Sequence, residues 1–505
     1  MSLTPQAALD ELNAKTRAIA MLNSCASLLG WDERTYMPPQ GGPHRAEQLA
    51  LLAGMTHERL VDPRIGELLS TLRNSDLVTD PDGDPAVIVR EVGRSYDRAV
   101  KMPRSLVEEI TRTASLGQTA WEEARAKADY AIFKPWLAKM IDLKKQEAEA
   151  VGYQVDPYDA LLDDYEPGAT VAITGTILTQ LRTELVGLLE KIRGSSRRPR
   201  LEILNRRYPI ERQKEFGRLC SEAIGFDYQK GRLDVTTHPF CTGIGPGDVR
   251  LTTRYNEQNF AHALFGTLHE SGHGIYDQGL DPRHFGTPLG DFISLGIHES
   301  QSRLWENLVG RSRSFWVHFF PRAQQAFPEA LADVTLDDLF FVVNDVRPSF
   351  IRVEADEATY NLHILLRFEL ERAFFSGQLS VDDIPAVWNE KFRAYFGLTP
   401  PTDREGCLQD VHWSAGYIGY FPTYSLGNLY AAQLFAQAQS DLGDLDAMFA
   451  RGEFAPIKEW LGRKIHSQGR RFRAADLVQR VTGKPLSSAA LMSYMNAKFG
   501  ALYGF

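Results

Sequence analysis

Long stretches of helix-forming sequence are the feature that most restricts the fold of this chain. Residues 104–151 are rich in strong helix formers, and Pro135 is the one proline among them. Apolar residues recur at three- and four-residue steps over residues 5–30, and residues 170–193 repeat this amphipathic pattern. We therefore predict a mainly α protein, with an interruption of the second helical run at Pro135.

Two short runs depart from the helical pattern. Residues 233–241 (LDVTTHPFC) and 249–255 (VRLTTRY) alternate in polarity and are rich in threonine and valine, as half-buried strands are. The residues between them, 242–248 (TGIGPGD), are dense in turn formers. This arrangement predicts a small antiparallel β-hairpin, placed directly before the next helix.

Composition excludes several classes of protein. With 56 Lys and Arg against 65 Asp and Glu, the net charge of -9 disfavours general nucleic-acid binding. No run of about 18 apolar residues occurs, so we expect no membrane span, and the N-terminus does not resemble a secretory signal. The four cysteines are far apart and form no C-x-x-C pair, which fits free thiols in a reducing cytoplasm: Cys25, Cys220, Cys241 and Cys407.

The helix predicted over residues 259–279 carries an H-E-x-x-H motif. His269 and His273 lie one turn apart on one face, which is the spacing at which two imidazoles bind one Zn²⁺. Glu270 then lies beside the metal, where it can take a proton from a bound water. The motif predicts a zinc site with His269 and His273 as ligands and Glu270 as general base.

The alternative is a buried helix whose histidines only pack and form hydrogen bonds. Gly272 and Gly274 argue against it, because each glycine costs a helix about 1 kcal/mol relative to alanine. Close approach of another element or of a substrate would explain their presence.

A catalytic zinc site needs a third protein ligand and an open position. The helical segment 291–310 offers two neighbouring candidates, His298 and Glu299. They point about 100° apart on a helix, so only one should face the metal. Coordination by two histidines and one glutamate is well attested in zinc peptidases, which favours Glu299.

The sequence resembles the thermostable carboxypeptidase Taq family of metallocarboxypeptidases, peptidase family M32. The resemblance runs through nearly the whole chain, in order, and is carried by the following blocks: Trp31-Asp32 to Leu49, His238-Pro239-Phe240, Asp248 to Thr252, His269 to His273, His298 to Gln301, Ile351 to Asp356, Gly406 to Trp413 and Gly419 to Tyr424.

The resemblance implies a fold and an activity. Members of this family are cytoplasmic zinc enzymes that release single residues from peptide C-termini with broad specificity, and they are typically homodimers. The implied fold is a mainly α zinc peptidase related to neurolysin and angiotensin-converting enzyme, with a deep substrate cleft and a small antiparallel hairpin or sheet beside the zinc helix. One catalytic domain over residues 1–505, one Zn²⁺ per chain and possible substitution by Co²⁺ follow from the same resemblance.

Arg352 is the candidate for binding the α-carboxylate of a peptide substrate. It lies in the family's I-R-x-x-A-D block, and an arginine fork binds carboxylates in a bidentate manner. The alternative is a structural ion pair with Asp356, four residues further on at helical spacing.

Two further roles are implied by the related converting enzymes, which use a histidine and a tyrosine. His412 is assigned to binding of the substrate or the tetrahedral intermediate, and Tyr420 to the oxyanion, with Tyr424 as the close rival. The alternatives are a buried, hydrogen-bonded histidine and a core tyrosine. His238 is expected on the edge of the first strand, where it could contact the substrate, unless His238-Pro239-Phe240 is only a turn.

Three functions compete. The leading one is a zinc metallocarboxypeptidase that acts on peptides with a free C-terminus. A dipeptidyl carboxypeptidase or oligoendopeptidase with the same zinc site is the nearest alternative. An inert helical scaffold that keeps a zinc site is the third, and Glu270 argues against it, because a structural site needs no base.

Overall fold

Local sequence signals set the boundaries of the first helix, α1 (Pro5–Thr35). In the computed structural model, which describes residues 3–505, the side chain of Thr4 accepts a hydrogen bond from the N–H of Ala7. Pro5 occupies the first turn, where a missing backbone N–H has no consequence for the helix. The helix predicted over residues 5–30 is confirmed and extends five residues further.

The run 104–151 forms two helices rather than one interrupted helix. Helix α5 (Arg104–Lys127) ends at Ala128, whose φ of 54° lies in the left-handed region. Asp129 then caps α6 (Tyr130–Val151) by accepting from the N–H of Ala131. The prediction that Pro135 interrupts the run is wrong, because this proline lies inside α6 and removes only one backbone hydrogen bond.

By the contacts among its residues, the described chain divides into two compact units, each assembled from three separate segments. Unit 1 contains the N-terminal segment to Val100, Pro199–Val343 and Ala431–Pro485, and unit 2 contains Lys101–Arg198, Asn344–Tyr430 and Leu486–Phe505. Because the segments alternate along the chain, no linker in the sequence reveals this division. A single catalytic domain over residues 1–505 stays a prediction.

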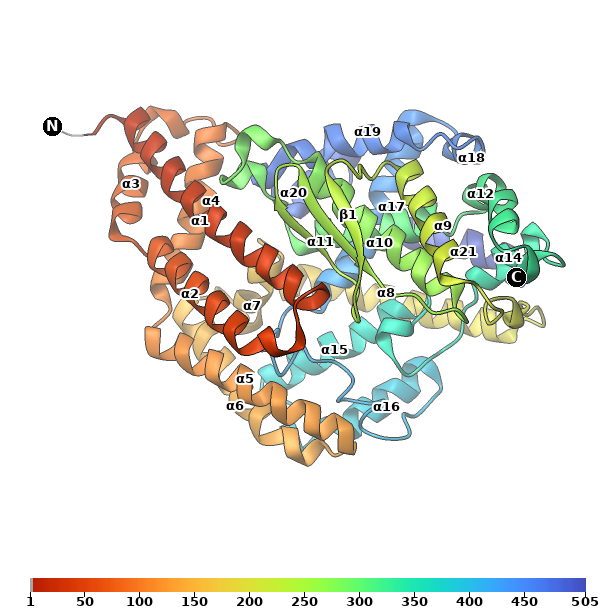
Figure 1. The fold of residues 1–505 in the computed structure, drawn as a ribbon. Helices are drawn as coiled ribbons and strands as arrows, with labels where there is room; N and C mark the ends of the chain where they lie inside the picture. Colours follow the sequence, from red (N-terminus) through yellow and green to blue (C-terminus); the bar gives the residue numbers. More distant parts are fainter. Residues whose placement is uncertain (1–2) are drawn as a thin grey trace. The chain divides into compact units, whose positions relative to one another are not determined.

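Unit 1 holds the small sheet and most of the helices. In addition to α1 its helices are α2 (Gly42–Leu60), α3 (Pro63–Arg73), α4 (Asp84–Lys101), α9 (Ile210–Ile224), α10 (Phe260–Gly279), α11 (Leu295–Arg303), α12 (Arg313–Ala326), α13 (Pro328–Leu331), α14 (Leu336–Val343), α18 (Leu445–Ala450), α19 (Ala455–Lys464) and α20 (Ala474–Thr482). Helices α1 and α2 run side by side (Figure 1), and buried aliphatic residues of α1, α3 and α4 form one hydrophobic cluster with Leu289.

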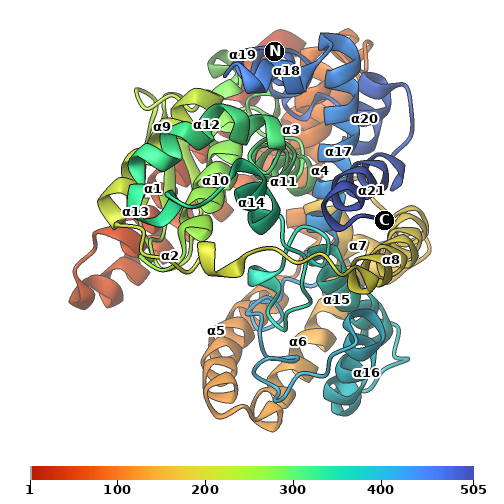
Figure 2. The same ribbon diagram turned by 90° about the vertical axis from the view of Figure 1, so that its right-hand side faces the viewer.

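Unit 2 is helical. Its elements are α5, α6, α7 (Pro157–Tyr165), α8 (Val171–Gly194), α15 (Tyr360–Phe375), α16 (Ile384–Phe396) and α21 (Ala489–Tyr503). Helices α5 and α6 lie side by side (Figures 1 and 2). Thr170 caps α8, which confirms the helix predicted over residues 170–193. Helix α17 (Pro422–Leu442) begins in unit 2 and continues into unit 1.

The sheet has three strands where two were predicted. Strands β1 (Gly231–Val235), β2 (Cys241–Gly245) and β3 (Asp248–Thr253) lie in the order β1-β3-β2. Strand β2 pairs antiparallel with β3, whereas β1 pairs parallel with β3, with Gly231 opposite Val249. The predicted antiparallel pairing of the first and last runs is therefore wrong. The glycine-rich composition of residues 242–248 hid β2, whose turn into β3 takes only two residues.

The sheet and several helices surround α10, the helix that carries the H-E-x-x-H motif. Strands β2 and β3 contact α10 (Figure 1), and α9 lies along α10 with α12 against α9 (Figure 2). A mainly α fold with a small sheet beside this helix is confirmed. Among residues 3–505, no helix is both long enough and apolar enough to cross a bilayer.

Candidate metal centre and substrate-binding residues

Close packing of two helices builds the candidate metal centre in unit 1. A Cβ atom added at Gly272 of α10 would lie 2.6 Å from the backbone of Gln301 and of Ser302 on α11. A Cβ added at Gly274 would lie 2.6 Å from the ring of Phe226. The two glycines therefore allow α11 and neighbouring side chains to approach the motif helix, as their presence in the sequence suggested.

Three side chains on these helices face one another. The Nε2 atom of His269 lies 3.6 Å from Oε2 of Glu299, and Nε2 of His273 lies 3.5 Å from the same oxygen. In a tetrahedral zinc site with bonds of about 2.0–2.1 Å, ligand atoms lie about 3.3–3.4 Å apart. The donor types and their spacing therefore fit a divalent metal, and His269, His273 and Glu299 could hold it.

His298, the rival of Glu299, is engaged elsewhere. Its Nε2 lies 3.0 Å from a carboxylate oxygen of Asp277. Its ring stacks on that of His273, with centroids 4.4 Å apart and an angle of 18° between the planes. These contacts support Glu299 as the third ligand and leave His298 beside the cluster.

Burial sets the protonation of the residues around this centre. Burial raises the pKa of Glu270, which is 6% exposed, to about 7. Burial also lowers the pKa of His273 to about 4, so its imidazole is neutral and has a lone pair for a metal. A carboxylate with a pKa near neutrality can both take and return a proton.

Arg352 lies in unit 2 and does not pair with Asp356. The Arg352 side chain is buried and forms hydrogen bonds from Nε to Asp410, at 2.9 Å, and from Nη1 to the hydroxyl of Tyr360, at 3.1 Å. Asp356 instead accepts hydrogen bonds from Thr359 and from the N–H of Ala358. The alternative role for Arg352, a structural pair with Asp356, assumed helical spacing, but Arg352 lies in a 3₁₀ turn, η7 (Arg352–Glu354).

Asp410 holds a second arginine that sequence reasoning missed. Nε of Arg367, on α15, lies 2.6 Å from the other carboxylate oxygen of Asp410. Burial opposes the charge on Asp410, but the two guanidinium groups outweigh it and keep the pKa of Asp410 well below its usual range. The net charge of these three side chains is +1. Asp410 lies two residues before His412 in a quoted block, but nothing in the sequence pairs it with Arg367.

The structure groups the other three predicted residues of unit 2 near Arg352. The ring of His412 lies 5.4 Å from that of Tyr420, and its Nε2 lies 3.4 Å from the hydroxyl of Tyr424. The guanidinium of Arg352 lies 5.2 Å from the centre of the Tyr424 ring. Burial and the charge on Arg352 lower the pKa of His412 to about 3, so this imidazole is neutral. Both tyrosines therefore remain candidates for the oxyanion.

His238 does not lie on a strand. Strand β1 ends at Val235 and β2 begins at Cys241, and His238 is an exposed residue of the bend between them. The prediction of a strand-edge position for His238 is therefore wrong. Pro239, which follows it, cannot donate to a ladder and helps to end the strand pairing here. A contact of His238 with the substrate stays a prediction.

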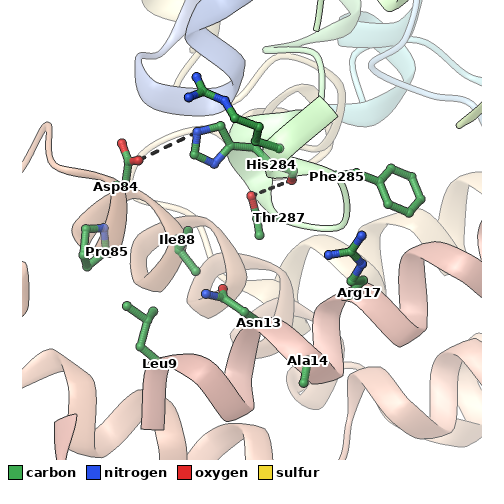
Figure 3. Close-up of a pocket in the computed structure, with 11 residues that line it drawn as sticks. Leu9, Asn13, Ala14, Arg17, Asp84, Pro85, Ile88, His284, Phe285 and Thr287 are labelled. Carbon is green, nitrogen blue, oxygen red and sulfur yellow. Dashed lines mark hydrogen bonds and ion pairs between the residues drawn. The ribbon is translucent and has the colours of Figure 1, made fainter. Parts of the chain in front are cut away.

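Two hollows in unit 1 do not involve the metal-ligand cluster. One, of about 520 Å³, is lined by α1, residues 243–246 and Asp277 among others. The second, of about 500 Å³, lies between α1, the start of α4 and residues 283–287, and contains the ion pair of His284 and Asp84 (Figure 3). No residue with a role predicted from the sequence lines either hollow.

Comparison with known proteins identifies the family. The sequence pattern of the Carboxypeptidase Taq (M32) metallopeptidases matches residues 11–499. The chain belongs to this family. It is 50% identical to thermostable carboxypeptidase 1 of Thermus thermophilus, over 99% of this chain and all of the relative, and 41% identical to carboxypeptidase 1 of Bacillus subtilis, over 96% of this chain and 97% of the relative.

Solved structures agree. The crystal structure of the M32 carboxypeptidase from Deinococcus radiodurans has a TM-score of 0.95 at 40% identity, covering 99% of this chain and all of that chain. The prediction of an M32 metallocarboxypeptidase is thereby confirmed, and membership implies a divalent metal, for which His269, His273 and Glu299 form the candidate site. The deep substrate cleft stays a prediction.

Proposed function

We propose that this metallocarboxypeptidase is a zinc enzyme that releases single residues from the C-termini of peptides, with broad specificity. The observation that carries the proposal is that two imidazole nitrogens face one oxygen of Glu299 with Glu270 next in sequence to His269. Two histidines and one glutamate are a ligand set of catalytic zinc, which keeps a fourth position open. Cobalt could take the same place.

Zinc, when bound, would supply a Lewis acid that polarises the scissile carbonyl and makes water more acidic. Glu270 takes a proton from the attacking water while the water oxygen bonds to the carbonyl carbon of the scissile peptide bond. Glu270 then returns this proton to the amide nitrogen as the C–N bond breaks. The products are a shortened peptide with a new carboxylate and one free amino acid.

The two buried arginines of unit 2 support the proposal that the enzyme acts at the C-terminal end of a peptide. Arg352 and Arg367 share a single aspartate, so a buried positive charge is left for an anion to offset. A peptide always carries such an anion at its C-terminus. We assign Arg352 to this carboxylate and His412 to the substrate or intermediate. Tyr420, with Tyr424 as rival, donates to the developing oxyanion.

The remaining proposals rest on the family. We propose that the enzyme acts in the cytoplasm as a homodimer, with one zinc ion per chain and His238 in contact with the substrate. Light scattering of the metal-loaded protein would test the dimer, because a mass of one chain would contradict it. The peptide Kd of a His238→Ala variant would test the contact with His238.

A double substitution of substrate and enzyme tests the central step. Amidation of the peptide removes its C-terminal anion, and Arg352→Ala removes the cation. If the two groups meet, each change alone should lower kcat/KM by about 2–5 kcal/mol, as for a buried charge pair. Both changes together should cost much less than the sum of the two.

Other outcomes are informative as well. Additive losses would mean that Arg352 does not contact the carboxylate. Rapid cleavage of amidated peptides by the unmodified enzyme would favour an oligoendopeptidase, and release of dipeptides would favour a dipeptidyl carboxypeptidase.

A further inference from the structure

Helix α11, which carries Glu299, is followed by a segment with a different helical geometry. Helix α11 ends at Arg303 and continues as a π-helical segment, η6 (Leu304–Val309). π-Helical turns are rare and are found frequently at functional sites, because the wider turn redirects the side chains that it carries. Glu306 lies on this turn, seven residues after Glu299.

Glu306 contacts one of the two candidate imidazole ligands. A carboxylate oxygen of Glu306, Oε2, lies 2.9 Å from Nδ1 of His269. Glu306 is also paired with the guanidinium groups of Arg303 and Arg311. An ionised carboxylate can only accept, so the proton lies on Nδ1. Nε2, which faces Glu299, is then the nitrogen with the free lone pair.

Arg303 connects this outer carboxylate to the ligand carboxylate. Its Nε lies 2.7 Å from Oε1 of Glu299, and its Nη1 lies 3.3 Å from Oε2 of Glu306. Oε2 of Glu299, the oxygen that faces both imidazoles, has a longer contact of 3.1 Å with the hydroxyl of Ser302. Arg303 thus occupies one oxygen of Glu299 and leaves the other directed at the metal position.

The second ligand imidazole is held differently. Among residues 3–505, Nδ1 of His273 has no hydrogen-bond partner although it is buried, and His273 is held by the stacked ring of His298. The same region contains a carboxylate–imidazole pair of similar length in Asp277 and His298, but His298 is not among the candidate ligands. This second pair provides an internal control.

We propose that Glu306 and Arg303 are positioning residues of the metal centre. Glu306 fixes the tautomer and the orientation of His269, and Arg303 restricts Glu299 to a single ligand oxygen. The inference rests on the proposed zinc site. A histidine ligand held by an outer carboxylate is a more basic and better oriented ligand, and loss of such a partner weakens metal binding.

Competition with a chelator tests the role of Glu306, with zinc alone as the probe. Glu306→Gln keeps the shape and removes the charge, and its zinc affinity should fall about 10–100-fold. Glu306→Asp keeps the charge but draws the carboxylate back by one methylene, and it should also bind more weakly. Asp277→Asn makes the same kind of change at a pair whose imidazole is not itself a candidate ligand, and it should keep the parent affinity.

The outcomes separate the possible failures. Parent affinity in both Glu306 variants would overturn the role of Glu306, and so would an equal loss in Asp277→Asn, because that would indicate a general effect of charge near the site. An unmodified protein that binds no zinc would overturn the proposed function instead. If Glu306→Gln does not fold, as judged by circular dichroism of the metal-free form, Glu306→Asp decides.

X-ray absorption at the zinc edge tests the role of Arg303. In the loaded Arg303→Met variant, Glu299 is free to bind with both oxygens, so we expect one additional oxygen neighbour relative to the parent. Arg311→Met is the matched control, since Arg311 lies 3.5 Å from Glu306 and donates hydrogen bonds to Asn307 and to the carbonyl of Val343. An unchanged number of neighbours in Arg303→Met would contradict the proposal.

Discussion

Two buried charged clusters in this protein are built in opposite ways. The cluster of unit 1 places His269, His273 and Glu299 on two helices that are close in sequence, and helical periodicity directs their side chains together. The cluster of unit 2 joins Arg352 and Arg367 through Asp410, which lies 58 and 43 positions further along the chain. In the first cluster, helix geometry places the side chains on a common face. In the second cluster, the charges come together only when distant segments of the chain fold against one another.

The charges also differ in what they lack. In unit 1, Glu299 and Glu306 are paired with Arg303 and Arg311. The donor atoms of His269, His273 and Glu299 lie together there and fit a divalent cation. In unit 2, one aspartate serves two arginines, and we propose that the substrate carboxylate is their further partner. One cluster is suited to a metal and the other to a carboxylate, which are the two charged components that a metallocarboxypeptidase must bind.

The largest effect should come from Glu270→Gln. Glu270 is assigned as base and not as ligand, so the variant should bind zinc normally while kcat falls by about 10²–10⁴ or more. Zinc content and peptide hydrolysis are measured on the same preparation. Full activity in a zinc-replete Glu270→Gln protein would remove Glu270 from the mechanism and leave the metal cluster without a base.

The next effect concerns the stability of the arginine cluster. Asp410→Asn leaves two buried arginines without a charged partner, and removal of one member of a buried pair destabilises a protein by about 3–5 kcal/mol. Denaturant unfolding of the metal-free protein measures this loss. Asp382→Asn is a matched control, because Asp382 pairs with Lys134 at an exposed position of the same unit and should change little. Equal losses of unfolding free energy in the two variants would show that the buried Asp410 contributes no more to stability than the exposed Asp382.

A smaller effect should appear as a pH dependence. Glu371 is buried and accepts hydrogen bonds from Tyr158, Trp413 and the N–H of Gly419, yet burial raises its pKa to about 7. Between pH 4.5 and 7 the folded state holds a proton that the unfolded state has lost, so stability falls as pH rises through this range. The total is about 3 kcal/mol and levels off above pH 7.

Unfolding of the parent and of Glu371→Gln at pH 5 and pH 8 measures this dependence. The stability of the parent relative to the variant should be lower at pH 8. A constant difference would mean that Glu371 titrates with an ordinary pKa, and the contrast between Glu371 and Asp410, which is paired with two arginines, would be lost.

The metal centre could be predicted from sequence because its information is local. The spacing of His269 and His273, the position of Glu270 and the choice of Glu299 over His298 all follow from helix geometry and ligand chemistry, and the contacts of His298 support that choice. The break at Ala128 could not be foreseen in the same way, because a non-glycine residue with positive φ carries no clear signal. Strand β2 was hidden by its own glycines.

The arginine cluster could not be predicted beyond its single members. Arg352 was singled out by resemblance, but the sequence suggested Asp356 as its alternative partner, since that residue lies four positions away. The observed partner, Asp410, lies on a different segment, and the pairing depends on how unit 2 folds. The role of Glu306 could not be predicted for a related reason. Glu306 contacts His269 from a π-helical turn, and no sequence pattern predicts such a turn.

The central claim is that His269, His273 and Glu299 hold one zinc ion, and the metal content of two neighbouring variants tests it most directly. Glu299→Ala and His298→Ala change adjacent residues on the same helix, and both proteins are loaded with zinc and measured by elemental analysis. The account predicts that His298→Ala retains about one zinc per chain, as a catalytic site with three protein ligands requires, and that Glu299→Ala retains little or none. Zinc retained by Glu299→Ala and lost from His298→Ala would contradict it.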